Sequence, residues 1–249
     1  MKRFDSFLYE KELALELHDH LNKKIWEEDD KGKLVLIPEV REKLLTIAEV
    51  WREFANVPEK AVKNILLTGG LANYNYTDYS DLDLHLLVDY DLITKSEDKE
   101  FLLDYYRDKK FIWALKHSDI TIKGYPVELY AQPMTQVPRE GQGIYSIKNN
   151  RWVQEPVHKN IDFTNDPYLK DKVAYYEKYI NSIITSDKPN MDAIEKLKEK
   201  IKRMRNNAIA KGGEFSKDNL VFKALRNDGL LDKLGEYQTN LRAKELSLK

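Results

Sequence analysis

The chain has 249 residues, of which 42% are hydrophobic and 11% aromatic, so it can build a packed core and is not a disordered chain. Its formal net charge of −1 excludes a polycation of the kind that coats nucleic acid. It contains no cysteine, which excludes disulfides, thiolate zinc sites and cysteine nucleophiles.

The charge is unevenly distributed along the chain. Residues 190–249 contain 14 Lys/Arg and 9 Asp/Glu, a surplus of 5 positive charges that leaves −6 for the rest, so a polyanion should prefer this last quarter. No run approaches the roughly 18 apolar residues of a membrane span, and the first 20 residues carry acids where a signal peptide has an apolar core. We therefore expect a cytoplasmic protein without a membrane partner.

The first 60 residues predict helices that pack on a core further along the chain. Apolar residues recur every three or four positions over residues 6–26 and again over 37–55, which is typical of amphipathic helices. The period then changes. The stretch AVKNILLTGG, residues 61–70, is a short aliphatic run ended by glycines, and DLDLHLLVDYD, residues 81–91, alternates before a turn, so together they predict strand, loop, strand.

The rest of the central region alternates between helix and hairpin signals. Residues 96–117 predict a helix with Ser96 as its cap and acids in its first turn. Two hairpins should follow, one turning at Lys123-Gly124 and one at Asn149-Asn150. We expect this core domain to cover residues 61–156.

After Pro156 the pattern is helical, and we expect a helical domain over 157–249. Helices are predicted over about 167–185, over 191–211 before Gly212-Gly213, and from an N-cap at Ser216 to Gly229. The fold class is therefore α/β (α+β), a mixed sheet flanked by helices with a helical C-terminal part.

Two acids inside an apolar strand suggest a metal site. On a strand over 81–88, Asp81, Asp83 and His85 share one face while the leucines between them point to the core. The two carboxylates would lie roughly 6 to 7 Å apart. Their repulsion is on the order of 2 to 3 kcal/mol at an effective dielectric of about 20, and a divalent cation would convert it into attraction. The alternative is a solvated edge strand.

Other acidic and phosphate motifs fail on spacing. Counted from Asp81, an EF-hand needs glycine at the position of Leu86 and glutamate at that of Leu92. The chain has neither G-K-[ST] nor G-x-G-x-x-G. A third carboxylate is available at Glu128, the only acid of YPVELYAQ, and a two-metal phosphoryl-transfer site needs one from a neighbouring strand. The alternative for Glu128 is a residue at the rim of an edge strand.

The stretches LLTGG, DLDLHLLV and VELY resemble the signature of the DNA polymerase β-like nucleotidyltransferase superfamily. Over residues 60–235 the pattern resembles the nucleotidyltransferases of tailed phages, which implies the host cytoplasm as location. The resemblance implies that Asp81, Asp83 and Glu128 bind Mg²⁺ or Mn²⁺, and that Gly69-Gly70 hold the phosphates of a nucleoside triphosphate. Many members have serine at the place of Gly70, where this chain offers only backbone N–H groups.

Several other residues are candidates for nucleotide binding. Aromatic residues in the spacer could stack on a base, the residues after a glycine-rich turn could border the nucleotide, and one face of the last capped helix could reach the triphosphate. Core packing, an ordinary hairpin and a solvated face are the respective alternatives. The cofactor-binding candidates beyond the glycines are Tyr74, Ser80, Tyr145, Ser146, Asn219, Lys223 and Arg226. His85 and Tyr76 are weaker candidates, and Lys198, Lys202 and Arg205 could guide RNA.

These observations lead to one functional hypothesis and two alternatives. The hypothesis is a metal-dependent nucleotidyltransferase that moves NMP from an NTP to an acceptor hydroxyl of RNA, protein or a small molecule, releasing pyrophosphate. The first alternative is a catalytically silent nucleotide-binding module of the same fold. The second is a toxin-like or antidote-like protein that modifies tRNA or protein.

Overall fold

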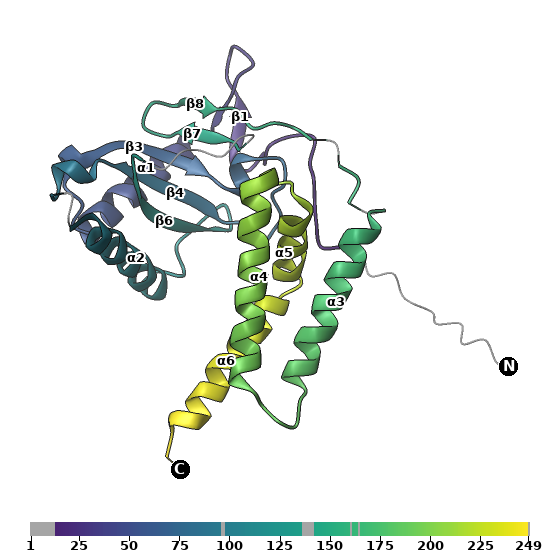
Figure 1. Cartoon of the computed structure of the whole chain (residues 1–249). Coiled ribbons are helices and arrows are strands. Elements are labelled where there is room, and N and C mark those ends of the chain that lie inside the picture. The colour runs from purple at the N-terminus through teal and green to yellow at the C-terminus, as the bar shows by residue number, and fades with distance from the viewer. Residues whose placement is uncertain (1–12, 96–97, 136–141, 160, 164, 249) are drawn as a thin grey trace. The chain divides into compact units, whose positions relative to one another are not determined.

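The computed structural model describes residues 13–95, 98–135, 142–159, 161–163 and 165–248 (Figure 1). It divides into two compact units. The first covers residues 16–159, and the second holds residues 13–15 with the described residues beyond 160.

In the part of the chain that the structure describes, the first unit is built on a six-stranded mixed sheet with strand order β5-β6-β4-β3-β7-β8. Among the described strands, the neighbours β6 and β4 are parallel, and the other neighbours are antiparallel. The strands are β3 (Val62–Thr68), β4 (Leu82–Val88), β5 (Thr121–Ile122), β6 (Tyr125–Pro133), β7 (Ile144–Ser146) and β8 (Arg151–Gln154). A separate antiparallel pair is formed by β1 (Trp26–Glu28) and β2 (Leu34–Leu36).

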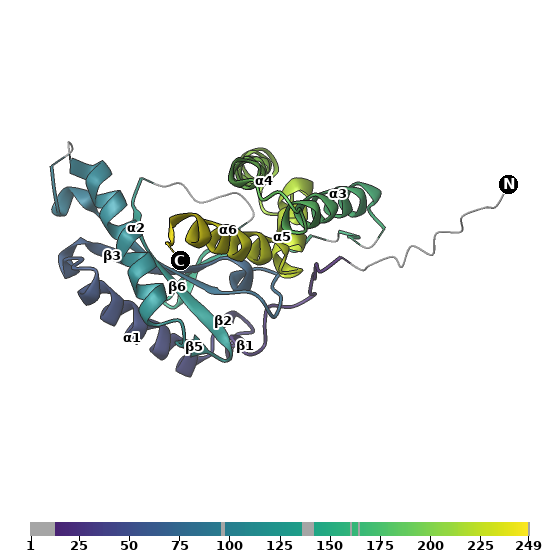
Figure 2. The ribbon, with the colours of Figure 1, turned by 90° about the horizontal axis from the view of Figure 1, so that it is seen from below.

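Two helices, α1 (Pro38–Phe54) and α2 (Lys99–Lys116), pack on one face of this sheet (Figure 2). Burial alternates strictly along β4, because Leu82, Leu84 and Leu86 enter a core shared with Trp51 of α1 and Tyr106 of α2. The residues between the leucines therefore lie on the opposite face. Short 3₁₀ turns complete the unit: η1 (Glu59–Ala61), η2 (Gly70–Ala72) and η3 (Tyr90–Leu92).

In its described residues the second unit has four helices: α3 (Pro167–Ile184), α4 (Met191–Gly212), α5 (Lys217–Asn227) and α6 (Leu230–Leu246). The short α5 contacts the other three, so its apolar residues form the centre of the unit. Asp166 and Asn190 cap α3 and α4 through their side chains. Ser216 occupies the N-cap position of α5, but its hydroxyl donates to the carbonyl of Gly213. No helix of the described residues is both long and apolar enough to cross a membrane.

The expected α/β fold class is confirmed, as are the helices and hairpins predicted between residues 37 and 229 within the described residues. The helix predicted over 6–26 is wrong for residues 13–26, where the chain is irregular and then enters β1. The apolar Leu21 and Ile25 are buried there without a helix, because Asn22 holds the local turn and donates to the Tyr125 hydroxyl at 2.8 Å. Residues 6–12 and the predicted cap Ser96 lie outside the described residues.

Candidate active site

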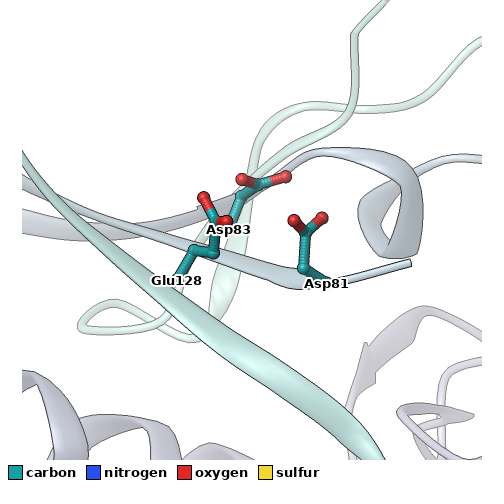
Figure 3. Close-up of side chains that lie close together, drawn as sticks. All are labelled: Asp81, Asp83 and Glu128. Atoms are coloured by element: carbon teal, nitrogen blue, oxygen red, sulfur yellow. The ribbon is translucent and has the colours of Figure 1, made fainter. Parts of the chain in front are cut away.

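Three carboxylates converge on the face of the sheet opposite α1 and α2 (Figure 3). Asp83 of β4 lies directly beside Glu128 of β6 in the parallel register, and Asp81 precedes β4 by one residue. One oxygen from each of the three side chains lies within 4.8 Å of the other two. The sequence-predicted cluster is therefore assembled, and the parallel pairing of β4 with β6 assembles it.

The cluster fits a hard divalent cation. Carboxylate oxygens are the ligands that Mg²⁺ and Mn²⁺ prefer. Around one octahedral ion with bonds of about 2.1 Å, ligand oxygens lie about 3 Å apart when adjacent and about 4.2 Å apart when opposite. The spread of 4.8 Å thus requires only small side-chain rotations, or accommodates two ions that share the ligands. Asp81 and Asp83 are partly buried and Glu128 is exposed, so solvent reaches one side of the cluster.

The glycine loop runs directly against Asp83. Gly69 has φ +79° and ψ −165°, a conformation that is essentially restricted to glycine. A Cβ atom placed there would lie 1.7 Å from Oδ2 of Asp83. At Gly70 a Cβ atom would lie 3.1 Å from the Ser80 hydroxyl oxygen. The predicted loop and the predicted acid are therefore in contact, and glycine at position 69 is what permits it.

The loop is anchored by residues that sequence reasoning did not single out. Asn73 donates from Nδ2 to the carbonyl of Gly69 at 2.6 Å and accepts at Oδ1 from the N–H of Gly143 at 2.8 Å. Trp26 donates from Nε1 to the carbonyl of Leu71 at 2.7 Å. Asn73 and Trp26 are both buried. A polar residue right after a glycine turn was the available signal for Asn73, whereas the long-range bond from Trp26 has no local signature.

A lysine also contacts the cluster, and the sequence analysis missed it. Lys110 of α2 donates from Nζ to Oε2 of Glu128 at 2.7 Å. Lys110 is four residues after the buried Tyr106 and three before the buried Trp113, so it lies on the stripe of α2 that faces the sheet. A charged residue in the middle of an apolar stripe was the signal that could have found it.

His85 lies on the same face as the acids, as the strand alternation predicted. Its Nδ1 lies 2.6 Å from Oε1 of Gln132, which requires an N–H at Nδ1 because the amide oxygen can only accept. Its ring meets that of Tyr130, its register partner on β6, edge to face at 5.4 Å. Burial lowers the pKa of the His85 imidazole, so the neutral ring is favoured.

The spacer residues are held by packing and turn contacts. The Ser80 hydroxyl is buried and accepts from the N–H of Thr77 at 2.9 Å, which shapes the turn before Asp81. Tyr74 meets the ring of His158 edge to face at 4.9 Å. Tyr76 stacks on His18 with ring centroids 3.8 Å apart. Nucleotide binding by Tyr74 and Ser80 stays a prediction.

Tyr145 and Ser146 have no exposed surface. The Tyr145 hydroxyl donates to Oδ1 of Asn150, and its ring packs edge to face on Trp152. The Ser146 hydroxyl donates to Oδ1 of Asn64 at 2.7 Å. Both side chains thus fix the β7–β8 hairpin against the sheet, and the structure does not bring them into the carboxylate cluster.

The three candidates on α5 lie in the second unit, where their side chains are more buried than a solvated helix face would be. Asn219 is fully buried and donates to the carbonyl of Glu214 at 2.6 Å. Lys223 lies 3.4 Å from Oε2 of Glu214, and burial lowers the pKa of its ammonium group. The Nε atom of Arg226 is buried without a hydrogen-bond partner. Their contact with a triphosphate remains a prediction.

The RNA-guiding residues predicted on α4 differ from one another. Lys198 donates to Oε1 of Gln238 at 2.6 Å, and Lys202 is exposed. Arg205 instead covers the ring of Phe222, with Cζ 4.3 Å from the ring centroid. These contacts do not test RNA guidance by α4, which stays a prediction.

Comparisons with known proteins give one structural similarity. No protein-family model and no curated protein matches the chain. Among solved structures, the STING-associated CdnE c-di-GMP synthase from Capnocytophaga granulosa matches 84% of this chain and 84% of its own, at 16% sequence identity and a TM-score of 0.22. A TM-score this low supports no statement about activity, so the function must be inferred from the site itself.

Proposed function

We propose that the chain is a metal-dependent nucleotidyltransferase that transfers NMP from an NTP to an acceptor hydroxyl and releases pyrophosphate. The observation that carries this proposal is the convergence of Asp81, Asp83 and Glu128 beside a glycine loop that contacts one of them. Metal ligands next to a bend that can approach phosphate closely are what phosphoryl transfer from a nucleotide needs.

The three carboxylates would hold Mg²⁺ or Mn²⁺, whose positive charge would stabilise the attacking and leaving oxygens around the α-phosphorus. Gly69 and Gly70 would place backbone N–H groups against the β- and γ-phosphates, because glycine lets the backbone approach a ligand closely. Asn73 and Trp26 would keep this loop in place by the hydrogen bonds described above. The loop and the acids then act on one triphosphate.

Glu128 is the proposed proton acceptor, since it is the most exposed acid of the cluster and lies on its open side. The acceptor hydroxyl would give its proton to the Glu128 carboxylate while its oxygen bonds to the α-phosphorus. The bond from the α-phosphorus to the bridging oxygen breaks in line, and pyrophosphate leaves with the electron pair. One phosphoanhydride bond is thus exchanged for one phosphoester bond.

The test is transfer of label from α-³²P NTPs. Each of the four NTPs is incubated with the protein, Mg²⁺ or Mn²⁺, and extracted RNA or protein, and the labelled product is identified. We expect label in one acceptor class and none with the double variant Asp81→Ala/Asp83→Ala, which should still fold. Asp78→Ala is the matched control, because Asp78 is an exposed aspartate of the same loop.

Three outcomes separate the hypotheses. Labelled RNA or labelled protein identifies the acceptor. Either result is also what the toxin-like and antidote-like alternatives predict. Metal-dependent NTP binding in calorimetry without pyrophosphate release favours the silent binding module. Undiminished transfer by the double aspartate variant contradicts the proposed mechanism.

A further inference from the structure

We propose that Lys110 is a resident counter-cation of Glu128, which a divalent cation must displace in order to use that carboxylate. Lys110 would thereby set the affinity of the site for Mg²⁺ or Mn²⁺. The proposal rests on the proposed function, since it concerns the same three acids, but it assigns a role to a residue outside them.

The position of Lys110 on its helix is the first argument. Tyr106 and Trp113 are the two buried residues of α2, and Lys110 lies on the same stripe between them. An apolar residue would normally stand there, because the stripe faces the sheet. A lysine at this position keeps its aliphatic stem along the apolar surface and brings its ammonium group to the rim. The charge therefore needs a partner at the edge of the sheet.

The shape of the sheet supplies that partner. β5 borders β6 only at Tyr125 and Pro126, so Glu128 lies past the paired part of that edge. α2 contacts β6, and Lys110 Nζ reaches Oε2 of Glu128 at 2.7 Å, the distance of a charge-assisted hydrogen bond. The side chains are 31% and 46% exposed, so the pair is partly solvated and can separate without stranding a buried charge.

The contact between Lys110 and Glu128 changes the charge balance of the carboxylate cluster. Three carboxylates within 4.8 Å repel one another, and Lys110 offsets part of that repulsion when no metal is bound. A divalent cation at Glu128 competes for the same oxygens and is itself repelled by the ammonium group. A partly exposed pair of this kind should weaken cation binding by roughly two- to fivefold.

The experiment is a Mn²⁺ titration followed by electron paramagnetic resonance, which measures bound metal without any turnover. Lys110→Met keeps an unbranched side chain, one atom shorter, with a similar helix preference, and removes its charge. We expect it to bind Mn²⁺ roughly two- to fivefold more tightly than the wild type. Lys110→Arg keeps the counter-charge and should bind Mn²⁺ no more tightly than the wild type.

Two controls isolate the contact. Lys109→Met removes the same charge from the neighbouring position, where Nζ lies over the rings of Phe54 and Tyr105, and should leave Mn²⁺ affinity close to the wild-type value. In a Glu128→Gln background, Lys110→Met should bring no gain, because the pair is already broken. Circular dichroism establishes that each variant is folded.

The outcomes decide between this inference and the proposed function. Wild-type Mn²⁺ binding with unchanged or weaker affinity in Lys110→Met overturns the counter-cation role and leaves the metal site standing. An equal gain in Mn²⁺ affinity in Lys109→Met also overturns it, because the effect would then come from the overall charge of α2 and not from the contact with Glu128. Absence of Mn²⁺ binding in every folded variant overturns the proposed function and this inference together.

Discussion

Replacement of Gly69 by alanine should disable the site by moving Asp83. The new Cβ atom would lie 1.7 Å from Oδ2, 2.8 Å from Cγ and 3.1 Å from Cβ of Asp83. Rotating only the carboxylate group moves the oxygens but not Cγ, so the whole Asp83 side chain must turn away or the backbone must shift. The positive φ adds about 1 to 3 kcal/mol of strain. We expect Mn²⁺ affinity to fall at least about tenfold, with a loss of stability of about 2 to 4 kcal/mol.

Gly124→Ala is the matched control for this variant. Gly124 also has a positive φ, of +90°, but a Cβ atom there meets no other atom within 4 Å. It should cost about 1 to 2 kcal/mol in urea denaturation and leave Mn²⁺ affinity unchanged. If Gly69→Ala matches Gly124→Ala in both stability and Mn²⁺ affinity, the close approach of the loop to Asp83 is refuted.

Three further predictions concern loop anchoring, pH and helix capping. Asn73→Ala removes the bonds to Gly69 and Gly143 and should destabilise the fold by about 2 to 4 kcal/mol in urea denaturation, while an unchanged midpoint would contradict the anchoring role. Burial raises the pKa of Tyr106 to about 12, so its stabilising effect is complete below pH 10 and is lost as pH rises from 10 to 12. Tyr106→Phe should flatten the stability profile in that window, and a profile as steep as the wild type would contradict it. Asp166→Ala removes the cap of α3 and the 2.7 Å ion pair with Lys217, which should lower the thermal midpoint by an amount equivalent to about 1 to 2 kcal/mol; an unchanged midpoint would exclude the cap.

The acids were predictable because strand alternation is a local property. In DLDLHLLV the leucines at every second position set the buried face, which places Asp81 and Asp83 on the other face. Glu128 was predicted as a lone acid in an apolar strand, but its register beside Asp83 arises from the parallel pairing of β4 with β6. The sequence near either strand does not encode that pairing, and the structure was needed to show that the oxygens meet.

The contacts that the sequence did not reveal are long-range. Lys110 and Glu128 are 18 residues apart, and Trp26 bonds to a carbonyl 45 residues away. The N-terminal error has a related cause. Residues 13–26 have helical spacing of apolar residues, but Leu21 and Ile25 are buried in the core of the first unit from an irregular segment, so tertiary contacts override the local period.

The most direct measurement is anomalous diffraction from crystals of this protein soaked in Mn²⁺ with a non-hydrolysable NTP analogue. The proposed function predicts one or two anomalous peaks among the oxygens of Asp81, Asp83 and Glu128, with triphosphate oxygens beside Gly69. Peaks located only elsewhere, or a Glu128 side chain turned away from a metal held by the aspartates alone, would contradict the shared site on which the proposal depends.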